Sequence, residues 1–416
     1  MGDGQAVLSS PSSARSRVRA RGGFVLALAG ALAMMAGASA PSPFYPVLQE
    51  RIGFSAGTMT IIFAVYALAL LVTLLVAGSL SDHLGRRPVI SAGLLILSAS
   101  MVAFWHADSI GVLIAARIVQ GVAAGLLMSS LSAAVVDLEP PTRPGSAAVL
   151  NAVTPLAGLA VGALASGLAL DRIDDDPLAA VFSALSVLFA VLGALVWLAP
   201  ETSSRVAGLR ASLRPEVGIP APARAEFLRA LPALVAGWAT GGLYLSLGAP
   251  LVARELDGSG HLSQGLVVTA LAAAGSLACF VARGWNGHAT TLYGTTALAT
   301  GTALSLVALG FGSLPGFIAA AVVAGTGFGT SFLGIMRSIT PLVGIHQRGE
   351  LFAAVFVVSY LAFGLPAVVA GYASTETGLA AAAYAYGGAV VLLAAAATIL
   401  RLRSERSHPS SQHHGP

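Results

Sequence analysis

Long apolar runs separated by short polar breaks make up most of this 416-residue chain. Twelve of these runs approach or exceed the roughly 20 residues that an α-helix needs to cross ~30 Å of hydrocarbon. They lack a clean polar stripe at the helical period, as expected for helices surrounded by lipid and other helices. The pattern therefore predicts an all-α integral membrane protein. The predicted spans are 24–46, 58–80, 88–106, 110–133, 145–170, 178–198, 230–251, 264–281, 289–311, 315–336, 351–372 and 379–400.

The first run admits two interpretations. Four Arg between positions 15 and 21 precede an apolar stretch that reaches Ala38-Ser39-Ala40, a pattern also typical of a signal peptide with its cleavage site. The apolar stretch continues to Pro46, which is longer than a usual signal core. We favour an uncleaved transmembrane helix, because twelve spans then return both ends of the chain to one side.

The longest polar break, residues 201–226, divides the spans six and six. A weak internal repeat agrees with this division: Val119-Gln-Gly121 with Gly125 matches Val323-Ala-Gly325 with Gly329 at an offset of 204. We therefore predict two six-helix halves. The expected segments are an N-terminal tail 1–23, a first half 24–200, a linker 201–229, a second half 230–403 and a disordered tail 404–416.

Composition and charge narrow the class further. Only 10% of the residues are charged, whereas a soluble domain carries about 25%. All 22 basic residues are Arg; with the N-terminus in the cytoplasm, eighteen fall on the cytoplasmic side, three outside and one within a span. This bias predicts that both termini are cytoplasmic in a bacterial inner membrane. The Arg are spread between spans and form no single soluble face, so we expect no nucleic-acid partner.

The strongest local pattern lies between the second and third spans, where residues 78–88 read GSLSDHLGRRP. Glycines permit a tight turn, and one carboxylate stands beside two guanidinium groups. An ordinary basic loop with a helix cap would not need this spacing. The candidate residues are Gly78, Asp82, Gly85, Arg86 and Arg87.

This loop resembles the signature loop of the major facilitator superfamily, G-x-L-x-D-x-x-G-R-R/K, with His83 at one usually basic position. The resemblance implies a transporter whose cytoplasmic charge network joins Asp82 and Arg86 to an acidic residue at the inner end of the fourth span, Asp137, with Glu139 as the alternative. It also implies that Asp82 faces the N-terminus of the eleventh helix, where the helix dipole favours a carboxylate. The network would latch the two halves together in the outward-open state.

The fourth span contains Arg117, Gln120 and Gly121. A charge inside a span costs at least ~2.5 kcal/mol on insertion scales, so it is a functional candidate. Alternatively, Arg117 snorkels to the outer headgroups. The spacing Arg117-x-x-Gln120-Gly121 resembles the R-x-x-Q/x-G motif of proton-coupled members of the superfamily, which implies that Arg117 faces the central cavity.

The fifth span contains Asn151, Thr154, Pro155 and Gly158. It resembles the antiporter signature of the superfamily, Gly-Pro-x-x-Gly-Gly, although Thr154 replaces the first glycine. The alternative is a kinked helix with a close contact at Gly158 and Gly162. The first interpretation supports export.

The second half departs from the pattern, since its loop 281–288 has no Asp and Ala321 takes the place of Arg117. No Asp or Glu lies clearly inside a span. A cavity with one fixed positive charge predicts a neutral or anionic substrate. Aromatic residues that could line this cavity are Tyr45, Tyr66, Trp238, Tyr244 and Tyr360.

We expect a secondary active transporter of a small molecule, working by alternating access as a proton-coupled efflux antiporter. An importer of a sugar or organic acid and a non-transporting receptor or membrane enzyme remain alternatives. The sequence has no phosphate-binding glycine loop, no paired metal ligands within a span and no Ser–His–Asp grouping. We therefore predict no enzymatic activity, no cofactor and no metal. The expected partners are the substrate, protons and the lipid bilayer, with the protein a monomer.

Overall fold

The computed structural model describes residues 11–256 and 260–406. All regular structure in these two ranges is helical. The α-helices are α1 (Pro11–Ser39), α2 (Tyr45–Ile52), α3 (Ala56–Ala77), α4 (Leu80–Leu84), α5 (Arg86–Trp105), α6 (Ile110–Asp137), α7 (Ser146–Arg172), α8 (Pro177–Leu195), α9 (Leu209–Ser212), α10 (Ala221–Glu255), α11 (His261–Val281), α12 (Gly287–Gly310), α13 (Leu314–Ile339), α14 (Arg348–Thr377) and α15 (Leu379–Arg406). Four short 3-10 helices are η1 (Val196–Leu198), η2 (Ala282–Gly284), η3 (Thr340–Leu342) and η4 (Ile345–Gln347).

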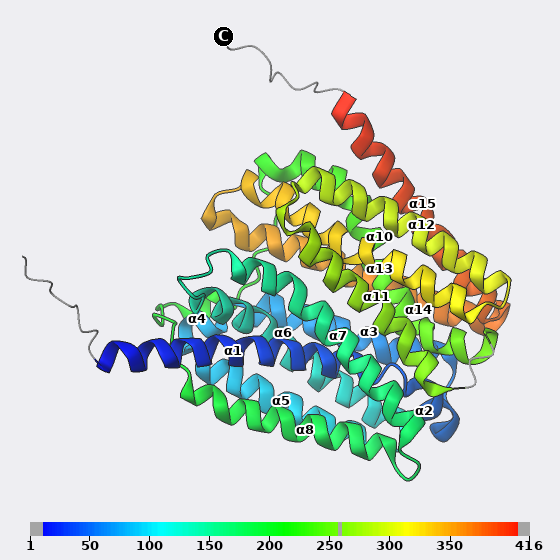
Figure 1. The fold of residues 1–416 in the computed structure, drawn as a ribbon, viewed down its shortest axis with the longest axis horizontal. Helices are drawn as coiled ribbons and strands as arrows, with labels where there is room; N and C mark the ends of the chain where they lie inside the picture. The colour runs from blue at the N-terminus through cyan, green and yellow to red at the C-terminus, as the bar shows by residue number, and fades with distance from the viewer. Residues whose placement is uncertain (1–10, 257–259, 407–416) are drawn as a thin grey trace, which may run out of the picture.

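Twelve helices of the described chain are long and apolar enough to cross a membrane, which confirms the predicted all-α membrane fold. The short helices α2, α4 and α9 lie between them. Helices α1 to α8 form one half of the molecule and α10 to α15 the other, as Figure 1 shows. We call the end of the bundle that holds α4 the terminal end and the end that holds α2 the far end.

The same glycine contact recurs in the two halves. A Cβ on Gly121 of α6 would lie 2.6 Å from the carbonyl oxygen of Tyr66 on α3. A Cβ on Gly325 of α13 would lie 2.2 Å from the carbonyl oxygen of Leu271 on α11. Only glycine allows such close helix packing. The fourth helix of each half therefore packs on the second in the same way, as the sequence repeat predicts.

Helix α1 ends seven residues before the predicted boundary, at Ser39 in place of residue 46. Pro41 and Pro43 disfavour helical backbone in the residues before them, and Pro46 fits the first turn of a new helix, α2. Within the bundle, the Ser39 hydroxyl donates to the Leu159 carbonyl of α7 over 2.8 Å. Helix α1 thus packs against α7 within the first half.

The linker is shorter than predicted. Helix α10 begins at Ala221, so it includes the end of the expected segment 201–229. Pro222 suits a first helical turn, and Phe227 is buried in a cluster at the terminal end. The sequence predicted the span 230–251 but not the first turns of this helix, because those turns are rich in charged residues.

The expected tails 1–23 and 404–416 also overlap helices. Helix α1 begins at Pro11 and α15 continues to Arg406. A helix that leaves the bilayer no longer needs apolar residues, so hydropathy does not mark its true end. The rest of both predicted tails, 1–10 and 407–416, lies outside the described residues.

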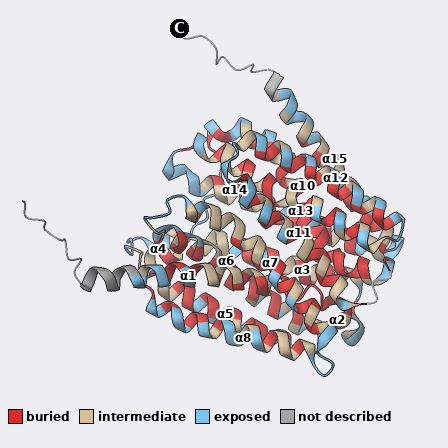
Figure 2. Cartoon of the chain, viewed as in Figure 1, coloured by how far each residue is buried: buried red, intermediate tan, exposed pale blue. Residues whose placement is uncertain are grey.

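The two halves are joined by hydrogen bonds at the far end. The Ser42 hydroxyl donates to the Leu245 carbonyl over 2.8 Å, and the Arg254 guanidinium donates to the Gln49 amide oxygen over 2.9 Å. The backbone N–H of Leu262 donates to Asp171 over 3.1 Å. Buried residues run through the interior of both halves (Figure 2). The far end is therefore closed in this conformation.

Candidate functional site

The loop 78–88 lies at the terminal end and forms the short helix α4, a glycine and the start of α5. Gly85 has a φ of +109°, a conformation that side-chain-bearing residues rarely adopt. A Cβ at Gly85 would also lie 2.7 Å from a carboxylate oxygen of Glu201. Both the turn and the neighbouring carboxylate therefore require glycine at this position.

The loop forms the charge network that the resemblance implies. Arg86 makes an ion pair with Asp82, and its Nε lies 3.2 Å from Asp137 on α6. Asp137, and not Glu139, is the acidic partner. Glu139 instead accepts the backbone N–H of Ala147 over 2.7 Å at the start of α7. These three charges, two of them on the loop 78–88, tie α4, α5 and α6 of the first half together.

A further carboxylate, which the sequence did not indicate, completes the network. The carboxylate of Glu201 accepts the backbone N–H of Arg86 over 2.8 Å and that of Arg87 over 3.3 Å. Partial burial raises the pKa of Glu201, but hydrogen bonds from the backbone N–H groups of Ser203, Arg86, Arg87 and Thr202 outweigh it. The pKa is thus lowered from its ordinary value of 4.5. Glu201 lies several residues after the end of α8. Only its position just after the sixth span, next to Pro200, could have indicated from the sequence that it belongs to the site.

The segment after Glu201 covers the loop. The backbone carbonyl of Asp82 accepts the Ser203 hydroxyl over 2.8 Å and the Val206 N–H over 3.0 Å. Nδ1 of His83 lies 2.6 Å from the Val206 carbonyl oxygen. The linker between the halves is therefore attached to the loop 78–88 and is not a freely flexible connection along this stretch.

The predicted contact between Asp82 and the eleventh membrane helix is not made in this conformation. No hydrogen bond or ion pair of residues 78–88 reaches α14 in the described chain. Near the start of α14, the carbonyl of Glu350 accepts the N–H of Gly218, which belongs to the linker, over 3.3 Å. Because the halves are held together at the far end here, a latch that forms only when the terminal end closes would be absent.

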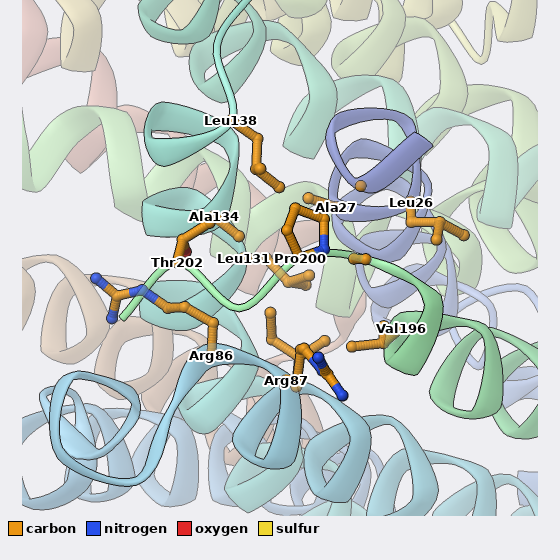
Figure 3. Close-up of a pocket in the computed structure, with 13 residues that line it drawn as sticks. Leu26, Ala27, Arg86, Arg87, Leu131, Ala134, Leu138, Val196, Pro200 and Thr202 are labelled. Atoms are coloured by element: carbon orange, nitrogen blue, oxygen red, sulfur yellow. The ribbon is translucent and has the colours of Figure 1, made fainter. Parts of the chain in front are cut away.

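A small hollow lies behind the loop, between α1, α5, α6 and the end of α8. Figure 3 shows Arg86 and Arg87 leaving the start of α5 in different directions, with Arg87 beside Val196. The Arg87 guanidinium lies 5.0 Å from the ring centre of Trp197, a cation–π distance. The hollow is lined mainly by apolar side chains, so we assign Arg87 to packing at the membrane boundary and not to the charge network.

Arg117 is enclosed within the first half and is only 2% exposed. Its Nε donates to the Tyr45 hydroxyl over 2.9 Å, and one terminal nitrogen donates to the Gln120 amide oxygen over 2.6 Å. Gln120 in turn donates to the Gly37 carbonyl over 2.8 Å. The ring centres of Tyr45, Tyr66 and Phe104 lie 5.3–5.4 Å from the guanidinium carbon.

These contacts correct two interpretations of Arg117. The side chain does not snorkel to the headgroups, since its charge is met inside the protein by a hydroxyl, an amide oxygen and aromatic faces. In this conformation it does not line an open central cavity either, because the rings of Tyr45 on α2, Tyr66 on α3 and Phe104 on α5 enclose it. In this conformation Arg117 positions α2 against α6.

The residues of the fifth span serve helix packing. A Cβ on Gly158 would lie 2.4 Å from the Leu32 carbonyl oxygen of α1, and Gly162 approaches Ala36 equally closely. Pro155 lies inside α7, and Asn151 donates to the Ser132 carbonyl over 3.2 Å. Thr154 is buried. The close contact between α7 and α1, which the sequence offered as the alternative, is thus present.

The aromatic candidates separate into two groups. Tyr360 meets Trp238 at a ring distance of 4.9 Å and donates to the sulfur of Met128 in the other half over 3.4 Å. Tyr66 lies near this contact. Tyr45 and Tyr244 are instead buried inside their own halves, with Tyr244 hydrogen-bonded to Ser305. Tyr45 and Tyr244 therefore do not line the surface between the halves.

Twelve membrane-spanning helices in two similar halves, with a charge network on the loop 78–88, define a class of polytopic membrane proteins. The family model described as Major Facilitator Superfamily matches residues 26–312. The chain belongs to the major facilitator superfamily, a family of membrane transporters.

Two relatives are similar over shorter stretches. The quinolone resistance protein NorA of Staphylococcus aureus is 28% identical over 98 residues, which are 24% of this chain and 25% of NorA. An uncharacterized MFS-type transporter of Mycobacterium tuberculosis, Rv1250, is 36% identical over 124 residues, or 30% of this chain and 21% of the relative. The chain thus matches about a quarter or less of the length of these relatives.

Proposed function

We propose that this chain is a secondary active transporter that exports a small molecule by alternating access. The observation that carries the proposal is the uneven joining of the two halves. Hydrogen bonds close the far end, while the charge network of the loop 78–88 stays within the first half. A protein that must open alternately at its two ends needs contacts that exist at only one end at a time.

Export in exchange for protons is supported by two likenesses. The first is the similarity of a quarter of the chain to NorA, whose name refers to quinolone resistance. The second is the motif of the fifth span, which resembles the antiporter signature. No Asp or Glu lies clearly inside a predicted span, so the proposal assigns proton transfer to no carboxylate within the membrane.

The surface between the halves favours a neutral, aromatic or lipophilic substrate. Tyr66, Met128, Trp238 and Tyr360 gather there, and the rings of Phe63 and Phe363 meet at 4.8 Å across the halves. Aromatic faces and a thioether bind planar apolar molecules well. The expectation of a neutral or anionic substrate rested on an accessible Arg117; because its charge is satisfied within the first half, we propose the neutral alternative.

The orientation follows from the Arg bias, which places the terminal end in the cytoplasm. After Cys279→Ser, single cysteines in residues 205–214 should resist a membrane-impermeant reagent in intact cells, and cysteines in residues 173–176 should react. Labelling of residues 205–214 would reverse the orientation and, with it, the assignment of the closed end.

Transport itself is tested in proteoliposomes with an imposed proton gradient. We expect a neutral aromatic dye to accumulate against its gradient when protons flow the opposite way, with Trp238→Ala reducing the rate. Uptake in the same direction as protons would identify an importer. No gradient-driven movement of any compound in a broad panel would contradict the transporter proposal.

A further inference from the structure

The second half carries a groove that the transport proposal does not use. Helices α11 and α12 both pack on α13, as Figure 1 shows, and side chains of all three line the groove. Its empty space is about 880 Å³, open side included. Leu277, Val281 and Tyr293 along it are 40–64% exposed, so it opens to the surroundings of the bundle. In a membrane, those surroundings are lipid.

Four of the six α11 residues that line the groove are alanines, and the other two are Leu277 and Val281. Ala270, Ala273, Ala274 and Ala278 line it on one helical face. Helix α3 is the counterpart of α11, and the two helices begin at residues 56 and 261, an offset of 205. Leu68, which is 55% exposed, therefore corresponds to Ala273. The second half has a hollow surface where the first half carries a leucine side chain.

The lining offers no free hydroxyl hydrogen to a polar ligand. The Tyr293 hydroxyl donates to Thr326 over 3.0 Å, and Thr326 donates to the Val323 carbonyl over 2.8 Å. Thr330 donates to the Thr326 carbonyl over 2.6 Å. With these donors already used, the groove suits a hydrocarbon chain.

The groove has the length of one leaflet. Between Ala270 and Val281 the helix rises about 16 Å at ~1.5 Å per residue, close to half of a ~30 Å hydrocarbon core. Its terminal end is marked by Trp285, whose ring meets that of Tyr293 at 5.5 Å. Trp and Tyr are enriched at the level of the headgroups. The groove thus runs from the middle of the membrane to the headgroups at the terminal end.

Positive charge lies at this end. Arg283 is exposed and donates to the Phe280 carbonyl over 3.0 Å through one terminal nitrogen, while Arg337 donates to the Arg283 carbonyl over 2.9 Å. Residues 260–349 contain no Asp or Glu. A phosphate next to Arg283 would meet no carboxylate from these helices.

We propose that this groove is a binding site for a phospholipid of the leaflet at the terminal end, with one acyl chain along α11 and its phosphate at Arg283. Arg283 lies in the chain between Val281 and Trp285, which line the groove, and its charge makes an anionic headgroup the preferred one. The site is independent of the surface between the halves, so it stands or falls separately from the transport proposal.

The test is lipid binding to the delipidated, full-length protein in detergent, measured by native mass spectrometry with phosphatidylglycerol, phosphatidylcholine and a free fatty acid. Wild type should retain one phosphatidylglycerol preferentially. Ala273→Phe should weaken this binding about tenfold, because overfilling a packed site costs about one decade or more in affinity. Leu68→Phe, the matched change on α3, should leave it unchanged.

Arg283→Gln should remove the preference for phosphatidylglycerol over phosphatidylcholine while one lipid still binds. Ala274→Leu provides a second, milder block if Ala273→Phe does not yield folded protein. Equal binding to wild type and both blocked variants would overturn the site. Preferential binding of the fatty acid, or a dimer that Ala273→Phe converts to a monomer, would show a different occupant and equally reject the proposal.

Discussion

The two halves share one architecture but stabilise it with different chemistry. In the first half, Arg117 is buried against Tyr45. In the second half, Ala321 takes the place that corresponds to Arg117, and it is fully buried. Tyr244 of that half forms a hydrogen bond with the Ser305 hydroxyl. The repeat thus preserves how backbones pack, while the charge belongs to one half alone.

The loops at the terminal end of the two halves also differ in the groups that hold them in place. In the first half, loop 78–88 carries its own Arg86, which pairs with carboxylates. In the second half, Arg337 of α13 reaches three backbone carbonyls of residues 282–285 at 2.8–2.9 Å. Carboxylate pairs can break and re-form with other charges, whereas contacts to backbone carbonyls fix one loop. The first half thus uses ion pairs at this loop, whereas the second half uses hydrogen bonds from one Arg to backbone carbonyls.

The largest effect is expected from moving the charge to the other half. Ala321→Arg should prevent folding, because the site is filled and offers no partners; an uncompensated charge there costs at least ~2.5 kcal/mol. The measurement is the yield of monodisperse protein after detergent extraction. Ala321→Ser, a small polar change, should fold. Normal yield of Ala321→Arg would show that the second half can satisfy a charge as the first does.

A smaller contrast is expected between two tyrosines. Tyr45→Phe leaves buried guanidinium hydrogens without an acceptor, which costs about 1–3 kcal/mol. Tyr244→Phe removes one hydroxyl pair, which contributes about 0.5–1.5 kcal/mol. Thermal unfolding in detergent should therefore show a lower melting temperature for Tyr45→Phe than for Tyr244→Phe. The reverse order would mean that Arg117 finds other acceptors when Tyr45 is changed.

Helices α5 and α12 each follow one of the two loops, and the stability of their first turns should depend differently on pH. Glu201 holds the start of α5, whereas the neutral Asn286 caps α12 by accepting the Ala289 N–H over 2.8 Å. The lowered pKa of Glu201 means that its stabilising effect is fully present above about pH 4.5 and is lost as pH falls through the folded-state pKa.

Hydrogen exchange should therefore increase at residues 86–90 on acidification below that range and not at residues 287–291. Glu201→Gln should show the increased exchange already at neutral pH. Equal acid sensitivity of both helix starts would remove Glu201 as the cause.

The smallest effect on stability is expected for Asp82→Asn. Its ion pair with Arg86 is 46% exposed on the Asp82 side, and such surface pairs contribute about 0–1 kcal/mol. Transport should nevertheless fall, because the latch to the second half would be lost and the far-end-closed state favoured. Spin-label distances across the terminal end should shift to longer values. Unchanged distances together with normal transport would remove the latch role.

The fold was predictable from sequence because lipid imposes it. Backbone N–H and C=O groups in hydrocarbon must form hydrogen bonds within their own helix. Each apolar run of sufficient length is therefore expected to form a transmembrane helix. The loop 78–88 was also recognisable, since Gly85 and the Asp82–Arg86 spacing act over one turn. The resemblance favoured Asp137 over Glu139, and the structure shows the contact of Asp137 with Arg86.

Only the tertiary structure decided which residues far apart in the sequence contact each other. Glu201 reaches Arg86 across 115 positions, and Tyr45 reaches Arg117 across 72. Hydropathy marks Arg117 as costly but carries no information on which side chains surround it. The sequence by itself determined the number and type of the spans, because each depends on a local run of apolar residues. Whether a charge faces a cavity or a neighbouring tyrosine depends on how separate helices pack. No local sequence pattern predicts that packing.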